Sequence, residues 1–238
     1  MNFQEFEHKL NITGKTLSIT RKNDVEPYCP IKSGCTISVL NNAMAGETIR
    51  LSEGVLSCPG AGRGFGFSDA PMEIPGGFGH FASYGAGEGF PPGLRLMRDP
   101  ELAEQSASAQ PKGVMKGFSI IEIKPFEESD SPDLVTVMAN SSQLSALNLL
   151  FHFRRLGDDL TIFPTGSGCF SLFRLPFSRL DSNNPRAIIG NADISSRPHF
   201  GADTLFFTVP GTVFREMLSD ADESFLATSS WEKIRQKM

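Results

Sequence analysis

The sequence predicts an α+β protein made of two similar halves packed as one globular unit. Short runs in which apolar and polar residues alternate, typical of strands, are interspersed with runs of helical periodicity. Of the 238 residues, 39% are hydrophobic and 21% are charged, which is the composition of a folded chain with a core. An offset of 111 residues also aligns one part of the chain with the other. Together these observations favour two related α+β halves.

The predicted elements of the first half follow one another closely. Residues 2–9 predict a helix because phenylalanine recurs at helical spacing, and residues 15–21 predict a strand because apolar and polar side chains alternate. A helix ending at residues 38–45 would be terminated by Gly46, since glycine readily adopts the left-handed conformation that follows helices. Further strands are expected at residues 47–51, 93–98 and 118–125, with a loop at residues 106–117.

The second half is predicted to repeat this order. Residues 133–139 predict a strand, and Ser141 is a suitable N-cap for a helix that runs through Leu156 and ends at Gly157. The remaining apolar runs predict strands at residues 160–163 and 204–209 and helices at residues 212–220 and 224–235.

The internal repeat matches residues that are chemically distinctive. At the offset of 111, Cys58 falls on Cys169 and Arg63 on Arg174, as do several glycine and leucine positions. If the repeat reflects duplication, residues 1–117 and 118–238 would pair about a pseudo-twofold axis, with a natural ligand site in the cleft between them. The alternatives are chance similarity and two cysteines that simply end core strands.

Charge and hydropathy exclude several classes of protein. The formal net charge of −5 argues against a nucleic-acid binder, which needs a basic face to neutralise phosphates. No apolar run approaches the roughly 20 residues that a membrane helix needs, and the N-terminal residues do not read as a secretory signal. We therefore expect a cytoplasmic protein with no membrane partner. A homodimer is compatible with the sequence, but no apolar stripe identifies its interface.

The segment 57–67 carries the strongest candidate for chemistry. Cys58 directly follows a predicted strand, and a helical turn beginning there would lower its pKa and favour the nucleophilic thiolate. Gly60 and Gly62 would let a flat or anionic ligand approach the backbone, and Arg63 would supply positive charge. The spacing matches neither a phosphate-binding loop nor a dinucleotide fingerprint. The alternative is a tight turn that packs its phenylalanines into the core.

A second glycine-rich segment, residues 76–90, mixes glycine with aromatic side chains. Such a loop could wrap a flat ligand, with His80 and Tyr84 as polar contacts. His80 is also the histidine nearest in sequence to Cys58, so it is the candidate base for a nucleophilic cysteine. The alternative is an irregular connector anchored by its phenylalanines.

The cysteines could instead hold a metal ion or an iron–sulfur cluster. Cys29, Cys58 and Cys169 are the candidate ligands, because three thiolates and one open position suit such a cluster. The pair Cys29 and Cys35 is a weak metal signal alone, since five intervening residues exceed the two to four usual in metal knuckles.

The chain resembles the ArCR family of prokaryotic proteins, also grouped as domain of unknown function 169. The resemblance covers about residues 15–218 and rests on five short matches, of which the Cys-Pro-Gly turn is the most specific: Tyr28-Cys29, Ser57-Cys58-Pro59-Gly60, residues 77–84, residues 133–140 and Gly168-Cys169. It implies that Cys29, Cys58 and Cys169 belong to one family pattern, which Cys35 does not match. It implies no reaction.

Three functions remain open from the sequence. The first is a cysteine-centred binding or redox protein that holds a metal, an iron–sulfur cluster or a thiol-reactive cofactor. The second is a non-metal enzyme or small-molecule-binding domain, with Arg63 as counter-charge and Cys58 as nucleophile. The third is a structural or partner-binding protein whose cysteines are buried and inert. The sequence identifies neither the ligand nor the reaction.

Overall fold

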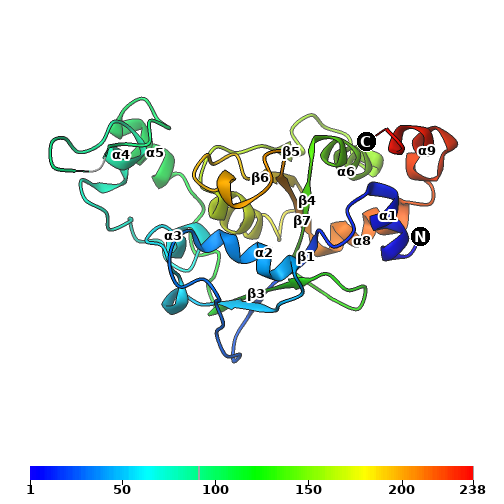
Figure 1. Ribbon diagram of the computed structural model, residues 1–238, viewed down its shortest axis with the longest axis horizontal. Helices are drawn as coiled ribbons and strands as arrows, with labels where there is room; N and C mark the ends of the chain where they lie inside the picture. Colours follow the sequence, from blue (N-terminus) through cyan, green and yellow to red (C-terminus); the bar gives the residue numbers. More distant parts are fainter. Residues whose placement is uncertain (91, 238) are drawn as a thin grey trace.

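The computed structural model describes residues 1–90 and 92–237, and in this part of the chain seven strands form one mixed sheet (Figure 1). The strand order is β2-β3-β1-β4-β7-β6-β5, and all pairs are antiparallel except the parallel pair β5 and β6. The strand bounds are β1 Thr16–Lys22, β2 Ile49–Leu51, β3 Ile120–Pro125, β4 Leu134–Ala139, β5 Thr161–Ile162, β6 Ala187–Gly190 and β7 Leu205–Pro210. The α+β class is confirmed.

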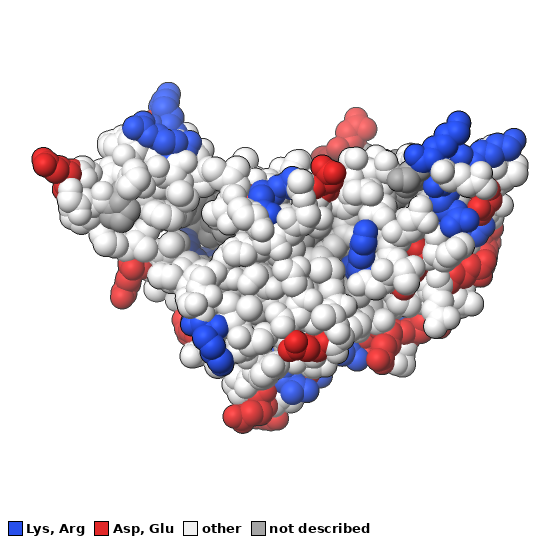
Figure 2. All heavy atoms as spheres, viewed as in Figure 1, with Lys and Arg blue, Asp and Glu red and all other residues white. Residues whose placement is uncertain are grey.

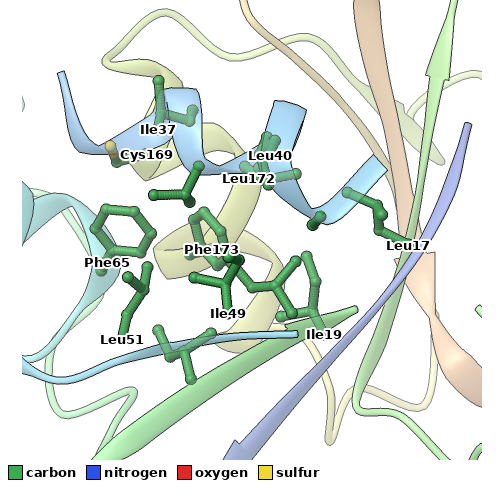
Figure 3. Packing of buried hydrophobic residues seen from close by; sticks show 14 of the residues in the cluster. Leu17, Ile19, Ile37, Leu40, Ile49, Leu51, Phe65, Cys169, Leu172 and Phe173 are labelled. Carbon is green, nitrogen blue, oxygen red and sulfur yellow. The ribbon is translucent and has the colours of Figure 1, made fainter. Parts of the chain in front are cut away.

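One face of the sheet, here called the first face, is covered by short helices. Strand residues such as Leu17, Ile19 and Ile121 point into its core. The covering elements are η1 (Thr36–Ser38), α2 (Val39–Met44), α3 (Ala61–Phe65), the π-helix η4 (Phe170–Arg174) and α7 (Leu175–Phe177). Figure 3 shows Leu40, Leu172 and Phe173 lying above Ile19 and Ile49 of the sheet. All four cysteines lie in or against this core.

The opposite face, the second face, is covered by longer and more regular helices. They are α1 (Phe3–Leu10), α6 (Ser141–Phe151), α8 (Gly211–Asp220) and α9 (Ser229–Arg235). Their core is aromatic: Phe214 of α8 meets Phe3, Phe6 and Phe126 edge-on, with ring centroids 5.1 to 6.3 Å away. Edge-to-face pairs of this kind each add about 0.5–1.5 kcal/mol beyond their buried area. Successive residues of β4 contribute to the two cores in turn. Leu134 and Met138 belong to the first-face core, and Val135 and Val137 belong to the second-face core.

An arm, residues 69–111, extends from the first-face side of the sheet and holds α4 (Gly77–Ala82) and α5 (Pro100–Ser108), which pack against each other. Figure 1 shows these two helices standing apart from the sheet. None of the described residues of the arm belongs to a hydrophobic core cluster.

Most predicted elements are present, but three predictions were wrong in the first half and its arm. Residues 93–98 form no strand, because the backbone N–H groups of Leu94, Arg95 and Leu96 donate to the carbonyls of residues 81–83 at the end of α4. Part of the predicted loop at residues 106–117 is helical, because α5 begins at Pro100 and continues to residue 108. The helix α4 was not predicted, whereas α3 lies where a helical turn was expected after Cys58.

In the second half, the helix predicted from Ser141 is real but its N-cap is Asn140. The Asn140 side chain accepts a hydrogen bond from the backbone N–H of Gln143, and the Gln143 side chain accepts one from the backbone N–H of Asn140. α6 ends at Phe151, a 3₁₀ turn, η3 (His152–Arg154), follows it, and the helical structure ends two residues before the predicted Leu156. The C-terminal helix predicted at residues 224–235 is divided into η6 (Phe225–Ala227) and α9.

Both predicted halves contribute to the single sheet. β1 pairs directly with β4, with Leu17 opposite Thr136, and β3 pairs with both β1 and β2. The two helices that the repeat equates, α2 and α6, lie on opposite faces. The internal repeat is therefore not confirmed, and the division between residues 117 and 118 stays a prediction.

Candidate functional site

The Cys58 turn lies between η2 (Glu53–Val55) and α3 on the first face. Cys58 is half-buried, and its carbonyl accepts a hydrogen bond from the N–H of Ala61 as the chain enters the helix. The helix packs tightly through Gly64, where a Cβ would lie 2.7 Å from the Cβ of Cys169. The turn thus brings Cys58 and Cys169, far apart in the sequence, to the same end of the core.

A hydrogen-bonded brace places Cys35 beside the same turn. The Ser57 hydroxyl and the Thr36 hydroxyl are 3.0 Å apart, and the Ser57 N–H donates to the Thr36 hydroxyl at 3.1 Å. The Ser57 hydroxyl also reaches the carbonyl of Gly34 at 3.1 Å. Because the brace uses the residues on both sides of Cys35 and the residue before Cys58, the two cysteine segments are held together.

Cys169 lies in helical conformation directly before the π-helix η4. It is 5% exposed, and Figure 3 shows it next to Ile37 and above Phe65. The preceding Gly168 is packed closely as well, since a Cβ there would lie 2.8 Å from Ile37. π-helical turns are rare and are frequently found at functional sites.

Cys35, Cys58 and Cys169 are together called the cysteine cluster, and the pKa values of Cys35 and Cys169 are raised. Burial raises the pKa of the Cys169 thiol well above its usual value of 9.0, and charges on Cys35, Cys58 and Asp193 would raise it further. Burial also raises the pKa of the Cys35 thiol, with smaller contributions from Cys58 and Asp193, against a backbone hydrogen bond that lowers it. Both thiols are consequently neutral near pH 7.

Cys29 occupies a different place. It is 2% exposed in the first-face core, and its thiol donates to the carbonyl of Ile31 at 3.4 Å. Sequence reasoning grouped Cys29 with Cys58 and Cys169, whereas the fold brings Cys35 beside these two. The only local signal for Cys35 was the hydroxyl residue that follows it, Thr36, and its partner Ser57 is identified only by the fold.

The described residues contain no group of three or more His, Cys, Asp or Glu side chains that could hold a metal ion. The cysteine cluster therefore has neighbouring thiols without the convergent geometry of a preformed metal centre. Metal ligation by Cys29, Cys58 and Cys169 stays a prediction that this arrangement does not support.

Arg63 is engaged with the backbone. Its guanidinium donates to the carbonyls of Asp69, Ala70 and Ala107, at 2.6 to 3.1 Å. These contacts tie the arm to α3. A cavity of about 60 Å³ beside Arg63, bounded also by Met72 and Glu104, has room for about two waters.

Arg174, which the repeat equated with Arg63, is fully buried beneath it. It donates to the carbonyls of Arg63, Ser68 and Pro111 and to the carboxylate of Asp69. The two arginines thus connect several backbone segments at the base of the arm, so these contacts are structural.

His80 and Tyr84 lie in the arm, and their rings meet edge-on with centroids 5.7 Å apart. The His80 ring is engaged at 3.1 Å with the carbonyl of Gly85, and Tyr84 is half-exposed. No described contact joins His80 to Cys58, so the arm geometry gives no support to a Cys58–His80 pair.

A larger, open cavity of about 280 Å³ lies away from the cysteines, on the second-face side. It is bounded by Met1, Asn2, Glu128, Arg215, Leu218 and Ser219. None of the residues proposed from the sequence contributes to it.

A comparison with protein families finds one match over most of the chain. The model of a family described as uncharacterised ArCR (domain of unknown function 169) matches residues 6–220. No curated protein and no solved structure matches the chain. Among the described residues, no helix has the length and apolar character required to cross a membrane.

Proposed function

The chain belongs to the uncharacterised ArCR family, and on that premise we propose that it acts through the cysteine cluster, as a protein that binds or exchanges electrons with a thiol-reactive small molecule. The observation that carries the proposal is the convergence of Cys35, Cys58 and Cys169 from three separate segments of the chain. A cysteine with a purely structural role does not require other cysteines nearby, whereas thiol chemistry commonly uses neighbouring cysteines.

The exposure of the cluster supports the same proposal. Cys35 and Cys58 are only half-buried, while Cys169 lies beneath them at 5% exposure. A reagent would therefore reach the two outer thiols without unfolding the core. Reactive cysteines are partly exposed, whereas structural cysteines are buried and inert.

The alternative of an anion-binding glycine turn has less support. The turn has its glycines, Gly60 and Gly62, but the guanidinium of Arg63 already donates to three carbonyls of the arm. Recruiting it to a ligand would leave those carbonyls without their donor. The cofactor site proposed from the sequence comprised Cys58, Gly60, Gly62, Arg63, His80 and Tyr84. In the fold, the first four residues lie in the Cys58 turn and α3, whereas His80 and Tyr84 lie in the arm.

The experiment is thiol titration of the native protein, purified without oxygen, with an aromatic disulfide reagent before and after unfolding. We expect a colourless protein in which Cys58 reacts quickly in the folded state. Cys58→Ser removes that fast reaction, while Cys29→Ser, the matched control outside the cluster, leaves it unchanged.

Two results would overturn the proposal. Thiols that all react only after unfolding would establish the inert structural function. A brown protein with stoichiometric iron and sulfide, both lost in Cys58→Ser and Cys169→Ser, would establish an iron–sulfur cluster in place of reactive thiols.

A further inference from the structure

The cysteine cluster is asymmetric in a way that assigns different roles to its members. Cys35 and Cys58 share the brace made by Thr36 and Ser57, and both reach the surface. Cys169 lies beneath, closed in by Gly64 of α3. Two thiols are therefore placed for a reaction with a solute, and the third is shielded from it.

The brace holds the segments of Cys35 and Cys58 side by side. Ser57 bonds to Gly34 on one side of Cys35 and to Thr36 on the other, so the segment that enters Cys58 lies directly against Cys35. A disulfide needs Cα atoms within about 7 Å and side chains that face each other. The hydrogen bonds between the two segments make Cys35 and Cys58 neighbours, and a charge on Cys58 acts on the Cys35 thiol.

The surroundings also separate the attacking thiol from the resolving one. Burial raises the pKa of the Cys35 thiol, and Cys58 and the carboxylate of Asp193 raise it further, so Cys35 is protonated near pH 7. Cys169 is protonated for the same reason and more strongly. Burial disfavours the attacking thiolate at Cys35 and Cys169, and the half-buried Cys58 lies in the turn that enters α3, so the first attack is assigned to Cys58.

The chemistry of the reagent follows from the charge around the cluster. Residues 33–46, 54–62 and 160–173, which carry the three cysteines, contain no Lys, Arg, Asp or Glu. Figure 2 shows a largely uncharged surface over α2, next to this site. The Asp193 carboxylate is a charged neighbour that raises the thiol pKa of both Cys35 and Cys169. A small neutral disulfide therefore suits the site better than an anionic one.

We infer that Cys58 and Cys35 form a redox-active pair that reduces small neutral disulfides, with Cys58 as the attacking and Cys35 as the resolving cysteine. The inference rests on the proposed function and names its substrate class. The Cys58 thiolate attacks one sulfur of the reagent, forming a mixed disulfide and releasing a thiolate that takes up a proton. Cys35 loses its proton and attacks the Cys58 sulfur, releasing the second thiol. The pair loses two electrons, and the reagent becomes two thiols.

The experiment treats the reduced full-length protein with hydroxyethyl disulfide at neutral pH, followed by alkylation, intact mass measurement and peptide mapping. Wild type should lose two hydrogens, carry no adduct, and yield one linked peptide pair that joins Cys35 to Cys58. Cys35→Ser should keep a stable mercaptoethanol adduct on Cys58. Cys58→Ser should show neither product.

Further variants control for position and folding. Cys29→Ser should behave as wild type, because Cys29 lies outside the cysteine cluster and takes no part in the exchange. Each substitution is repeated as alanine, and circular dichroism confirms that the variants are folded. A result obtained with both substitutions then reports on the thiol and not on an introduced hydroxyl.

The failures of the inference and of the proposed function can be told apart. A wild-type protein that reacts only after unfolding overturns both. A persistent adduct on wild-type Cys58, or a linkage between Cys58 and Cys169, leaves the proposed function standing and overturns the Cys35–Cys58 pair.

Discussion

The two faces of the sheet are built by different means. On the second face, α1 and α6 span 8 and 11 residues, and their N-cap side chains, Asn2 and Asn140, bond to the first turn. On the first face, α2, α3 and α7 span 3 to 6 residues and have no side-chain cap bond. Local signals thus explain the second face, whereas the first face depends on contacts between distant segments. The cysteine cluster lies on the face that long-range contacts hold together.

The sharpest test of this contrast is Arg174→Ala. Arg174 is fully buried and joins three backbone carbonyls and Asp69, from segments on both sides of the arm. Each buried acceptor left without a donor costs about 1–3 kcal/mol, so we expect the free energy of unfolding to fall by about 3–5 kcal/mol. Urea unfolding followed by circular dichroism measures the change.

The matched control for this substitution is Arg186→Ala. Arg186 pairs with Asp159, whose side chain is 69% exposed, and exposed ion pairs contribute about 0–1 kcal/mol. If the free energy of unfolding fell no more in Arg174→Ala than in Arg186→Ala, the stability of the first face would not depend on its buried arginine.

The next largest effect is expected from Gly64→Ala in α3. The added Cβ would lie 2.7 Å from the Cβ of Cys169, so α3 and η4 would have to move apart. Overpacking of this kind costs about 1–3 kcal/mol. Gly62→Ala in the same helix is the control, because its Cβ would lie 3.4 Å from the Glu53 carboxylate, within ordinary contact. Equal thermal stability of the two variants would contradict the tight packing of α3 on Cys169.

On the second face, Asn140→Ala should cost about 1 kcal/mol, because it removes the N-cap of α6 and its reciprocal bond with Gln143. Ser141→Ala should change the stability by less than about 0.5 kcal/mol, since Ser141 is exposed in the first turn of the helix. Chemical denaturation of the two variants distinguishes the observed cap from the one that the sequence predicted. A larger loss in Ser141→Ala would reverse the assignment.

The same contrast explains how much the sequence could predict. Periodicity located α1, β1, β4, α8 and β7 within about two residues, because each pattern is complete within its own segment. The short helices α3 and α7 and the π-helix η4 carry no such pattern, and their conformation follows from packing against one another.

The candidate site shows the same limit at single residues. Cys58 and Cys169 were grouped because an offset of 111 residues aligns them, and they lie near each other in the fold, but their neighbour was expected to be Cys29. The choice of Cys35 depends on the pairing of Thr36 with Ser57, which lies 21 positions further along the chain. No periodicity or spacing predicts one hydroxyl pair between two irregular segments.

Two buried glutamates extend the comparison to electrostatics. Glu7 of α1 and Glu122 of β3 are both 7% exposed. Burial raises the pKa of the Glu7 carboxyl, and hydrogen bonds from Thr16 and Gly14 only partly oppose it. Burial acts on Glu122 in the same direction, but hydrogen bonds from Lys22 and Arg50 outweigh it and hold its pKa below the usual 4.5.

The smallest expected effects come from replacing these two glutamates with glutamine. Glu122 stabilises the fold above the unfolded pKa near 4.5, and its contribution is lost as the pH falls through the lower folded pKa. Glu122→Gln should therefore cost about 1 kcal/mol at pH 7, since Lys22 and Arg50 are partly exposed, and should approach wild type in acid. The pH dependence of stability due to Glu7 has the opposite sign, because the Glu7 carboxyl binds a proton more tightly in the folded protein than in the unfolded chain. Glu7→Gln should be at least as stable as wild type at pH 7, and the two should converge as the pH falls through the raised pKa of Glu7. Urea unfolding of both variants from pH 3 to pH 7 measures this, and pH profiles of the same sign would show that Lys22 and Arg50 do not set the charge state of Glu122.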